Sequence, residues 1–197
     1  YLNDGKGNFS RSGQLFPATP TSFILSWDGD QDGDLDLIVG QRGFPFGYGI
    51  AVGVQFWKND GKGNFTDEST TLGQPFASLG MLTDGALADL DGDGKTELLL
   101  AGEWMALHVF TFDKGAWSNS TAQFGLENTR GFWKRILVAD VNGDGKTDLL
   151  AGNSGTNSRL RTSATKPLRL AINDFDQNGS IEQILHHHEN GKSIPWV

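Results

Sequence analysis

The segment Asp89–Glu97 reads DLDGDGKTE and is followed at once by the apolar run LLLAG. Three more segments follow the same nine-residue pattern, D-x-[DN]-x-[DN]-G-x-x-[DE]: Asp28–Asp36 (DGDQDGDLD), Asp140–Asp148 (DVNGDGKTD) and Asp174–Glu182 (DFDQNGSIE). Side-chain oxygens at positions 1, 3, 5 and 9 and a carbonyl at position 7 suit a hard cation, and the glycine at position 6 permits a tight turn. Four such loops, each followed by a strand-like apolar run, predict Ca²⁺ sites.

We therefore expect three to four Ca²⁺ ions. Each loop would provide oxygen-bearing side chains, with the main-chain carbonyl of its seventh residue completing the set. The predicted metal-site residues are Asp28, Asp30, Asp32, Asp34, Asp36, Asp89, Asp91, Asp93, Lys95, Glu97, Asp140, Asn142, Asp144, Lys146, Asp148, Asp174, Asp176, Asn178, Ser180 and Glu182.

The composition is that of a turn-rich β protein. The 197 residues include 27 glycines and 19 Phe or Trp, and no long segment repeats with a period of 3.6 residues. No apolar stretch approaches the ~18 residues that span a bilayer, so we expect this segment to be soluble and not inserted in a membrane. Cysteine is absent, which excludes a disulfide framework. Tyr1 lies inside a hairpin pattern, so we expect the chain to be a piece of a longer protein.

The net charge of −8 is concentrated in the four acidic loops. They hold 15 of the 24 acidic residues and two lysines, a balance of −13, while the rest of the chain carries +5. Because clustered carboxylates repel one another without metal, folding and Ca²⁺ binding should be linked. Seven basic residues outside the acidic loops lie between positions 130 and 169, but they follow no helical pattern. Nucleic acid is therefore not an expected partner.

A second repeat alternates with the first. YLNDGKGNF (1–9) returns as FWKNDGKGNF (56–65), and FTFDKGAWSNS (110–120) is a diverged copy. Each reads as a strand, a glycine turn and a returning strand, so we interpret Asp4 and Asp60 as turn formers and not as metal ligands. The two repeats together predict four-stranded antiparallel meanders of about 40–60 residues, a size typical of propellers and other arrays.

The loops begin at residues 28, 89, 140 and 174, and this spacing suggests where the units end. The last gap is too short for a full unit, so we expect the polar, turn-rich residues 153–165 to form an irregular loop in place of an outer hairpin. The expected organisation is one domain over residues 1–197, with blade pieces at about 1–20, 21–70, 80–122, 132–165 and 166–197.

The acidic loops followed by DLIVG, ELLLAG and DLLAG, with aromatic hairpins between them, resemble the FG-GAP/VCBS repeats of integrin α chains. The resemblance covers nearly the whole chain. It implies an all-β fold, a partial β-propeller of three to four four-stranded antiparallel blades, with Ca²⁺ in the hairpin that joins the first two strands of each blade. Family propellers usually close with about seven blades. The remaining blades would then come from the same or another chain.

Other calcium motifs fit these loops less well. An EF-hand needs flanking helices and a glutamate at position 12, where this chain has the apolar residues Val39, Leu100, Ala151 and Leu185. Dockerin-like loops continue into a helix, thrombospondin-type repeats need cysteines, and RTX repeats need glycine pairs. Acidic turns that bind no metal are the remaining alternative, most of all for Asp174–Glu182, because Asn178 lowers its charge.

Little in the sequence supports catalysis. There is no nucleophile elbow, no cysteine and no phosphate-binding loop before a helix. Glu103 is the best carboxylate outside the metal loops, but we expect no enzymatic activity in this segment. His186 and His188 could share one face of a strand, yet two ligands are too few for a closed zinc site, so an exposed strand end is favoured.

A ligand surface is expected on the face opposite the acidic loops, where the segments that follow the second strand of each blade would lie. Those segments and the loop Gly43–Gly49 (GFPFGYG) place aromatic beside polar side chains, which suits a sugar or a peptide. Packing between blades is the alternative for the tryptophans. The candidate ligand residues are Gln41, Arg42, Tyr48, Glu103, Trp104, Trp133 and Asn153.

The expected function is a non-catalytic module for ligand binding or adhesion, with a glycan or a protein as its ligand. We expect it to be extracellular, at the cell surface or periplasmic, because millimolar Ca²⁺ outside cells fills sites of modest affinity. An accessory domain of a secreted enzyme, such as a polysaccharide-degrading one, and a purely structural spacer are the alternatives.

Overall fold

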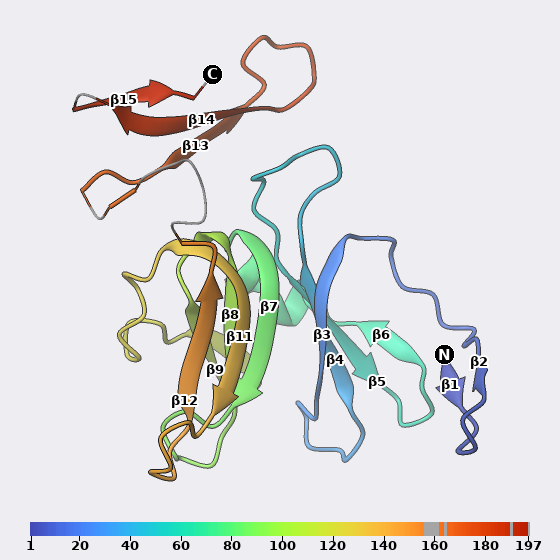
Figure 1. Cartoon of the computed structure of the whole chain (residues 1–197). Helices are drawn as coiled ribbons and strands as arrows, with labels where there is room; N and C mark the ends of the chain where they lie inside the picture. Colours follow the sequence, from blue (N-terminus) through green and yellow to red (C-terminus); the bar gives the residue numbers. More distant parts are fainter. Residues whose placement is uncertain (156–161, 164, 190, 197) are drawn as a thin grey trace.

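The computed structural model describes residues 1–155, 162–163, 165–189 and 191–196, and this part of the chain is mostly antiparallel β-structure (Figure 1). A one-turn helix, α1 (Ser69–Leu72), and a 3₁₀ turn, η1 (Gln74–Phe76), are its helical segments. No helix in the described residues is long and apolar enough to cross a membrane. The prediction of a β-rich chain is confirmed.

The first complete blade is a four-stranded antiparallel meander. Its strands are β3 (Thr21–Trp27), β4 (Asp36–Gln41), β5 (Val54–Asn59) and β6 (Phe65–Asp67). The first acidic loop joins β3 to β4, and the N-D-G-K-G-N turn joins β5 to β6, as the two sequence repeats predict.

The second blade repeats this order. It consists of β7 (Met81–Ala88), β8 (Glu97–Met105), β9 (His108–Asp113) and β10 (Ala116–Asn119), each paired with the next. The second acidic loop joins β7 to β8. The predicted meander is therefore confirmed for two blades.

The hydrophobic core lies between these two blades. Phe76 of η1 is fully buried, and its ring centroid lies 4.3 Å from that of Phe110 in β9. The ring of Phe23 in β3 covers Gly40 of β4 and Gly85 of β7, where any β-carbon would overlap it. Glycine is required at both positions because the aromatic ring and the backbone approach so closely.

The remaining strands extend the second blade or form smaller sheets. β11 (Gly131–Ala139) pairs with β12 (Asp148–Asn153) around the third acidic loop and also pairs with β8, so these two strands join the sheet of the second blade. β13 (Arg169–Asn173), β14 (Glu182–Glu189) and β15 (Lys192–Pro195) form a three-stranded sheet around the fourth. The N-terminal hairpin consists of β1 (Leu2–Asn3) and β2 (Phe9–Ser10).

The described residues thus contain two complete blades, a β11–β12 pair joined to the second blade, a two-stranded hairpin and a three-stranded sheet, and they do not close into a propeller. Three to four complete blades were expected. The third acidic loop has only its two flanking strands, and the fourth is part of a three-stranded sheet. The irregular loop expected at residues 153–165 lies largely in positions 156–161 and 164, outside the described residues.

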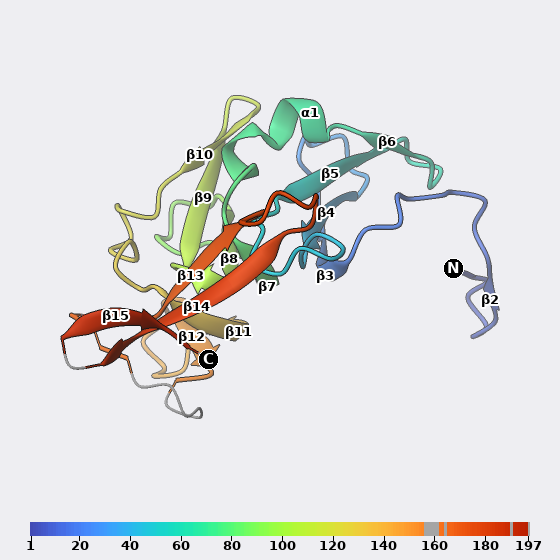
Figure 2. The same cartoon turned by 90° about the horizontal axis from the view of Figure 1, so that it is seen from above.

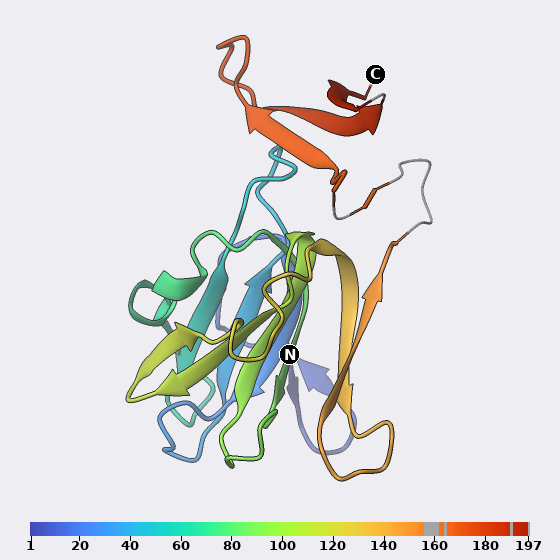
Figure 3. The ribbon, with the colours of Figure 1, turned by 90° about the vertical axis from the view of Figure 1, so that its left-hand side faces the viewer.

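Three acidic loops lie together at one end of the sheets, and the fourth lies apart. Figures 1 and 3 place the turns after β3, β7 and β11 at the lower end and the C-terminal sheet beyond the upper end. Seen from above, β13 and β14 extend across the ends of the blades (Figure 2). Gly49 lies against Leu170 and Ile172 of β13. The expectation that all four loops share one face is therefore wrong for the fourth, because β13–β15 form a separate sheet.

Candidate metal-binding loops and ligand face

The four acidic loops follow one backbone path. Positions 4 and 6 are left-handed in every loop, with φ between 60° and 91°. Position 6 is always glycine, as the motif requires, but position 4 is Gln31 in the first loop and Gln177 in the fourth. A left-handed backbone costs stability when the residue has a β-carbon. The sequence pattern identified position 6 and missed the constraint at position 4.

Bonds from the backbone to side chains hold this path. In every loop the side chain at position 3 accepts the N–H of position 5, and the side chain at position 5 accepts the N–H of position 7. In the second loop, Asp93 N lies 3.2 Å from the Asp91 carboxylate and Lys95 N lies 2.8 Å from that of Asp93. These short-range turns are the kind that aspartate and asparagine favour. They hold the acidic side chains of each loop in place.

The carboxylate at position 9 closes each loop by accepting the N–H of position 2. The N–O distances to Asp36, Glu97, Asp148 and Glu182 are 3.4, 2.9, 3.0 and 2.7 Å. Glu97 is only 2% exposed. Burial raises the pKa of Glu97, with Asp91, Asp93 and Asp89 adding to the effect and the N–H of Leu90 opposing it. A buried carboxylate beside other carboxylates is costly unless a cation compensates it.

In three of the loops, oxygens from three acidic side chains come within 4.8 Å of one another. The groups are Asp28, Asp30 and Asp32; Asp89, Asp91 and Glu97; and Asp174, Asp176 and Glu182. The third loop has the amide Asn142 at position 3 and forms no such group among the described residues. The fourth loop forms one despite Asn178. Donor sets made only of oxygen fit Ca²⁺, so these residues could hold the ion.

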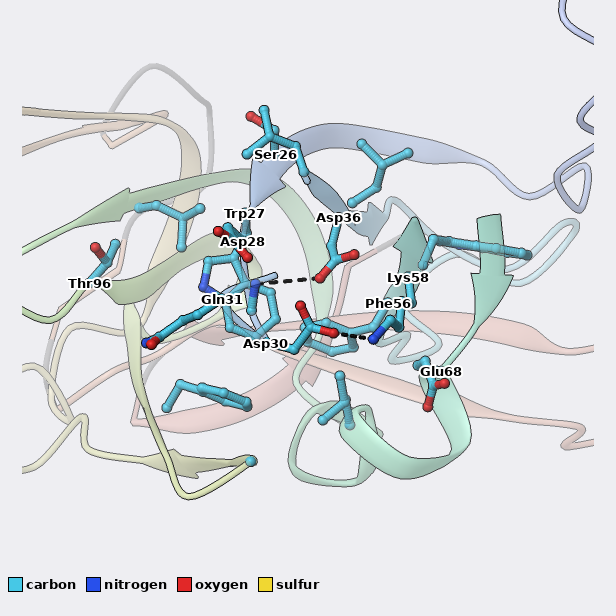
Figure 4. Close-up of a pocket in the computed structure, with 18 of the residues that line it drawn as sticks. Ser26, Trp27, Asp28, Asp30, Gln31, Asp36, Phe56, Lys58, Glu68 and Thr96 are labelled. Atoms are coloured by element: carbon cyan, nitrogen blue, oxygen red, sulfur yellow. Dashed lines mark hydrogen bonds and ion pairs between the residues drawn. The ribbon is translucent and has the colours of Figure 1, made fainter. Parts of the chain in front are cut away.

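The first loop differs because a lysine of β5 reaches into it (Figure 4). The ammonium of Lys58 donates to Asp30 and lies 3.8 Å from Asp32. This hydrogen bond lowers the pKa of Asp30. One oxygen each of Asp28 and Asp34 is buried without a hydrogen-bond partner in the described structure. Burial, and then the neighbouring carboxylates, raise the pKa of Asp34. Buried oxygens without partners need a donor or a cation.

A groove of about 1080 Å³ adjoins this loop, between the first and second blades (Figure 4). Trp27, Phe56 and Phe112 provide aromatic walls, and Lys58 lines the groove on the acidic side. This groove therefore lies at the metal-loop end, and not on the face where the sequence predicts a ligand.

In the third loop the backbone satisfies the carboxylate at position 1. Asp140 accepts the N–H groups of Gly143 at 2.7 Å, Asp144 at 3.2 Å and Gly145 at 2.8 Å. These bonds, that of Gly145 first, lower the pKa of Asp140. Asp89 and Asp174 accept two such bonds each. The carboxylate of Asp28 accepts none from described residues.

The aspartates of the N-D-G-K-G-N hairpins are used in their own turns. Asp60 accepts the N–H of Lys62 at 2.9 Å and that of Asn64 at 3.1 Å, and the amide of Asn64 donates to its other oxygen. Asp4 makes the equivalent bonds in the N-terminal hairpin. Their interpretation as turn formers is confirmed.

The structure brings four predicted ligand residues together around Glu103, at the end of β8. Glu103 is 3% exposed and accepts bonds of 2.9 Å from both Arg42 and Tyr48, and a third from Lys134. Burial opposes ionisation, but Lys134, Tyr48 and Arg42 together lower the pKa of Glu103. The indole of Trp104 donates to Tyr48 at 3.2 Å. Glu103 therefore serves as an ionised link between β8, β11 and the segment that follows β4, and it is too enclosed to meet a ligand directly.

Among the described residues, the other three predicted ligand residues form no hydrogen bond with the side chains of this group. Trp133 sits opposite Asn153 in the β11–β12 pair, and its indole donates to the carbonyl of Thr129 at 2.8 Å. Gln41 ends β4, with its N–H bonded to Gly53. Trp133 is partly buried. This agrees with the alternative that the sequence left open, in which the tryptophans pack inside the protein and do not contact a ligand.

The three histidines form no metal group in the described residues. The rings of His187 and Trp196 pack edge to face, with their centroids 4.9 Å apart. All three lie on β14, paired with β15. The prediction of a strand is confirmed, but that of an exposed strand end is wrong, because all three side chains are half-buried.

A comparison with known protein families supports the repeated pattern of an acidic loop between two strands. The model of the FG-GAP-like repeat matches residues 28–100 and again 89–151. The chain therefore belongs to the FG-GAP-like repeat family, and the resemblance inferred from the sequence is confirmed over residues 28–151. FG-GAP repeats imply propeller blades. No curated protein matches the chain.

Sequence reasoning missed two lysines. Lys58 of β5 contacts the first acidic loop, and Lys134 of β11 contacts Glu103. Lys58 precedes the hairpin turn by one residue in the second copy, where the first copy has Leu2. That difference between aligned repeats is the one signal that could have identified Lys58. Lys134 carries no comparable signal, because its contact with Glu103 depends on the pairing of β11 with β8, whose register the sequence does not reveal.

Proposed function

We propose that this chain is a Ca²⁺-binding FG-GAP module that acts in ligand binding or adhesion and is not itself an enzyme. The observation that carries the proposal is the common loop path, which gathers three carboxylates within 4.8 Å in three loops. Membership of the repeat family supports the same function.

The number of ions proposed is three to four. The first, second and fourth loops have carboxylate groups, and the third has Asp140, Asn142, Asp144 and Asp148 at the corresponding positions. Flexible all-oxygen loops suit Ca²⁺ better than Mg²⁺, which demands near-ideal octahedral geometry. Sites of modest affinity fill where Ca²⁺ is millimolar, so we place the protein outside the cytosol: extracellular, at the cell surface or in the periplasm.

The ligand would be a glycan or a protein, bound at the end of the blades opposite the first three acidic loops. Trp104 and Tyr48 supply aromatic surface there, and Glu103 and its partners hold them rigidly. Rigid support is what a binding site needs from its surroundings. Further blades, from the same or another chain, would complete the ring that the two full blades begin.

Isothermal titration of the 197-residue chain with CaCl₂ tests the metal part. We expect three to four ions per chain and much weaker binding of Mg²⁺. Asp91→Ala should remove one ion, whereas Asp60→Ala, in the hairpin turn, should leave the count unchanged. No heat of binding, or an unchanged count for Asp91→Ala, would refute the proposal.

A glycan array and a panel of immobilised extracellular proteins, probed in Ca²⁺, test the ligand part. Trp104→Ala should abolish the strongest signal, whereas Trp133→Ala, if folded, should retain it because that indole is bonded within β11 and the preceding turn. Binding that survives Trp104→Ala would place the ligand elsewhere.

A further inference from the structure

Trp104 is the unpaired residue of a β-bulge. Where β11 meets β8, Gly131 lies opposite Met105 and Phe132 lies opposite Glu103, so Trp104 has no partner in the register. Its φ is +63°, a left-handed conformation that is a genuine outlier for a bulky residue. Bulges re-aim side chains and are frequent beside functional sites, and such an outlier is a reason to look for a function.

A cavity of about 370 Å³ opens beside this bulge, at the junction of β8 with β9. Its polar lining comes from the start of β9, the end of β10 and the following loop, and its apolar wall from Leu79, Met105 and Ala106. The polar and aromatic lining residues are Ser78, Trp104, His108, Asn119, Thr121, Glu127 and Arg130. This volume is at the lower end of the range for small-molecule sites. It suits one ring and not an extended chain.

The polar groups of the cavity offer both donors and acceptors. The Nδ1 atom of His108 lies 3.2 Å from the hydroxyl of Thr121. Burial, and then the charge of Arg130, lower the pKa of His108, so the imidazole is neutral at physiological pH. Glu127 and Arg130 are exposed, and neither forms an ion pair with another described residue.

We propose that this cavity binds one neutral pyranose unit of a glycan, with the ring resting on Trp104 and its hydroxyls bonded to Glu127, Arg130 and His108. The proposal rests on the proposed function and names its ligand class. An aromatic face matches the apolar face of a sugar ring. Adjacent hydroxyls need donors and acceptors side by side. One carboxylate and one guanidinium favour neither an anionic nor a cationic ligand.

The test is a titration of the Ca²⁺-loaded chain with the methyl glycosides of glucose, galactose, mannose and N-acetylglucosamine, followed by saturation-transfer NMR. At least one should bind with a Kd of about 1 mM, typical of one small ring. Glu127→Gln and Arg130→Gln should each weaken it about tenfold or more. The matched control, Arg169→Gln on exposed β13, should leave it unchanged.

Two glycine substitutions separate binding from packing. Trp104→Gly relieves the left-handed strain and should abolish sugar binding without lowering the melting temperature substantially. Phe46→Gly relieves the same strain at a fully exposed aromatic outside the cavity, where φ is +62°, and should not affect binding. A large fall in melting temperature for Trp104→Gly would assign the indole to packing and contradict the proposal.

Two results would overturn the sugar assignment directly: no glycoside binds at about 20 mM, far above the expected Kd, or binding persists in both Glu127→Gln and Arg130→Gln. Preferential binding of glycine, added as a zwitterionic probe, would also refute it. A Ca²⁺ titration of the same sample keeps the two proposals distinct. Calcium binding without sugar binding would end this proposal alone, whereas absent calcium binding would end the proposed function.

Discussion

The first and third acidic loops follow the same sequence pattern and the same backbone path, yet their charges are balanced in different ways. In the third loop, three backbone N–H groups satisfy Asp140. In the first loop, Asp28 accepts no such bond and has one buried oxygen without a partner among the described residues, while the ammonium of Lys58 reaches Asp30 from β5. One loop is organised by its own backbone, and the other relies on a cation.

The comparison shows that the sequence motif specifies which oxygen atoms could bind the metal. It does not specify the charges and hydrogen bonds that surround those oxygens. Asp34 at position 7 adds a fifth carboxylate to the first loop, where the third has Lys146. The extra negative charge attracts any cation within reach, and the ammonium of Lys58 is one that contacts the loop. The first loop should therefore respond more strongly than the third to changes in metal and charge.

The largest expected effect comes from alanine at position 1. In saturating Ca²⁺, Asp28→Ala and Asp140→Ala should both destabilise the chain, because each removes a binding site. Losing a site costs about 2.7 kcal/mol of unfolding free energy when Ca²⁺ is a hundredfold above its Kd. In EDTA the two should diverge: Asp140→Ala stays destabilising, and Asp28→Ala becomes neutral or stabilising. Urea unfolding in both buffers measures this, and equal losses in EDTA would remove the distinction between the loops.

Next in size is the effect of Lys58. Lys58→Met removes a positive charge beside Asp30 and should tighten Ca²⁺ binding to the first loop about three- to tenfold, more so at low salt. Lys62→Met, an exposed lysine in the turn of the same hairpin, is the control and should change little. Isothermal titration measures both. An unchanged or weaker affinity in Lys58→Met would mean that the lysine does not compete with the ion.

The first and third loops differ at position 4, which is Gln31 in the first and Gly143 in the third, so each residue can be replaced by that of the other loop. Gln31→Gly in the first loop should raise the free energy of unfolding by about 1 kcal/mol, because glycine adopts the left-handed conformation without strain. Gly143→Gln in the third loop should lower it by a similar amount. Urea unfolding of the two variants should give changes of opposite sign. Changes of the same sign would contradict the shared backbone path.

The smallest effect is on pH dependence, measured without metal. The raised pKa of Asp34 means that its charge lowers stability at pH 7, a cost that disappears as the pH falls below the unfolded pKa. Asp34→Asn should therefore stabilise the metal-free chain at pH 7 and lose that advantage in acid. The lowered pKa of Asp140 gives the opposite sign, so stability is lost as the pH falls through its folded pKa. Asp140→Asn should destabilise at pH 7, and melting curves in EDTA from pH 7 to pH 3 would show whether the two differ.

The sequence predicted the parts of this molecule that depend on neighbours along the chain. The acidic loops, the meander of two blades and the turn role of Asp60 all follow from local patterns of glycine, aspartate and alternating apolar residues. The left-handed position 4 was missed because glutamine gives no sign of such a conformation. Glu103 was considered as a free carboxylate, whereas its bonds to Arg42, Tyr48 and Lys134 join residues up to 61 positions apart.

The position of the C-terminal sheet also lay beyond the sequence pattern. The fourth loop matches the motif as well as the others do, but β13 packs through Leu170 and Ile172 on the Gly43–Gly49 loop. Contacts between distant apolar residues decide where a sheet docks, and no local periodicity encodes them. The cavity beside Trp104 was missed for the same reason, since His108, Glu127 and Arg130 converge only once β9 and the loop after β10 are folded.

Thermal unfolding of the 197-residue chain with and without Ca²⁺ tests the central claim most directly. Melting curves would be recorded in EDTA, in about 1 mM Mg²⁺ and in about 1 mM Ca²⁺, near the extracellular level. The account predicts a melting temperature several degrees higher in Ca²⁺ than in EDTA, with Mg²⁺ close to EDTA, because an ion that binds only the folded loops stabilises them. Melting temperatures that coincide in Ca²⁺ and EDTA would contradict it.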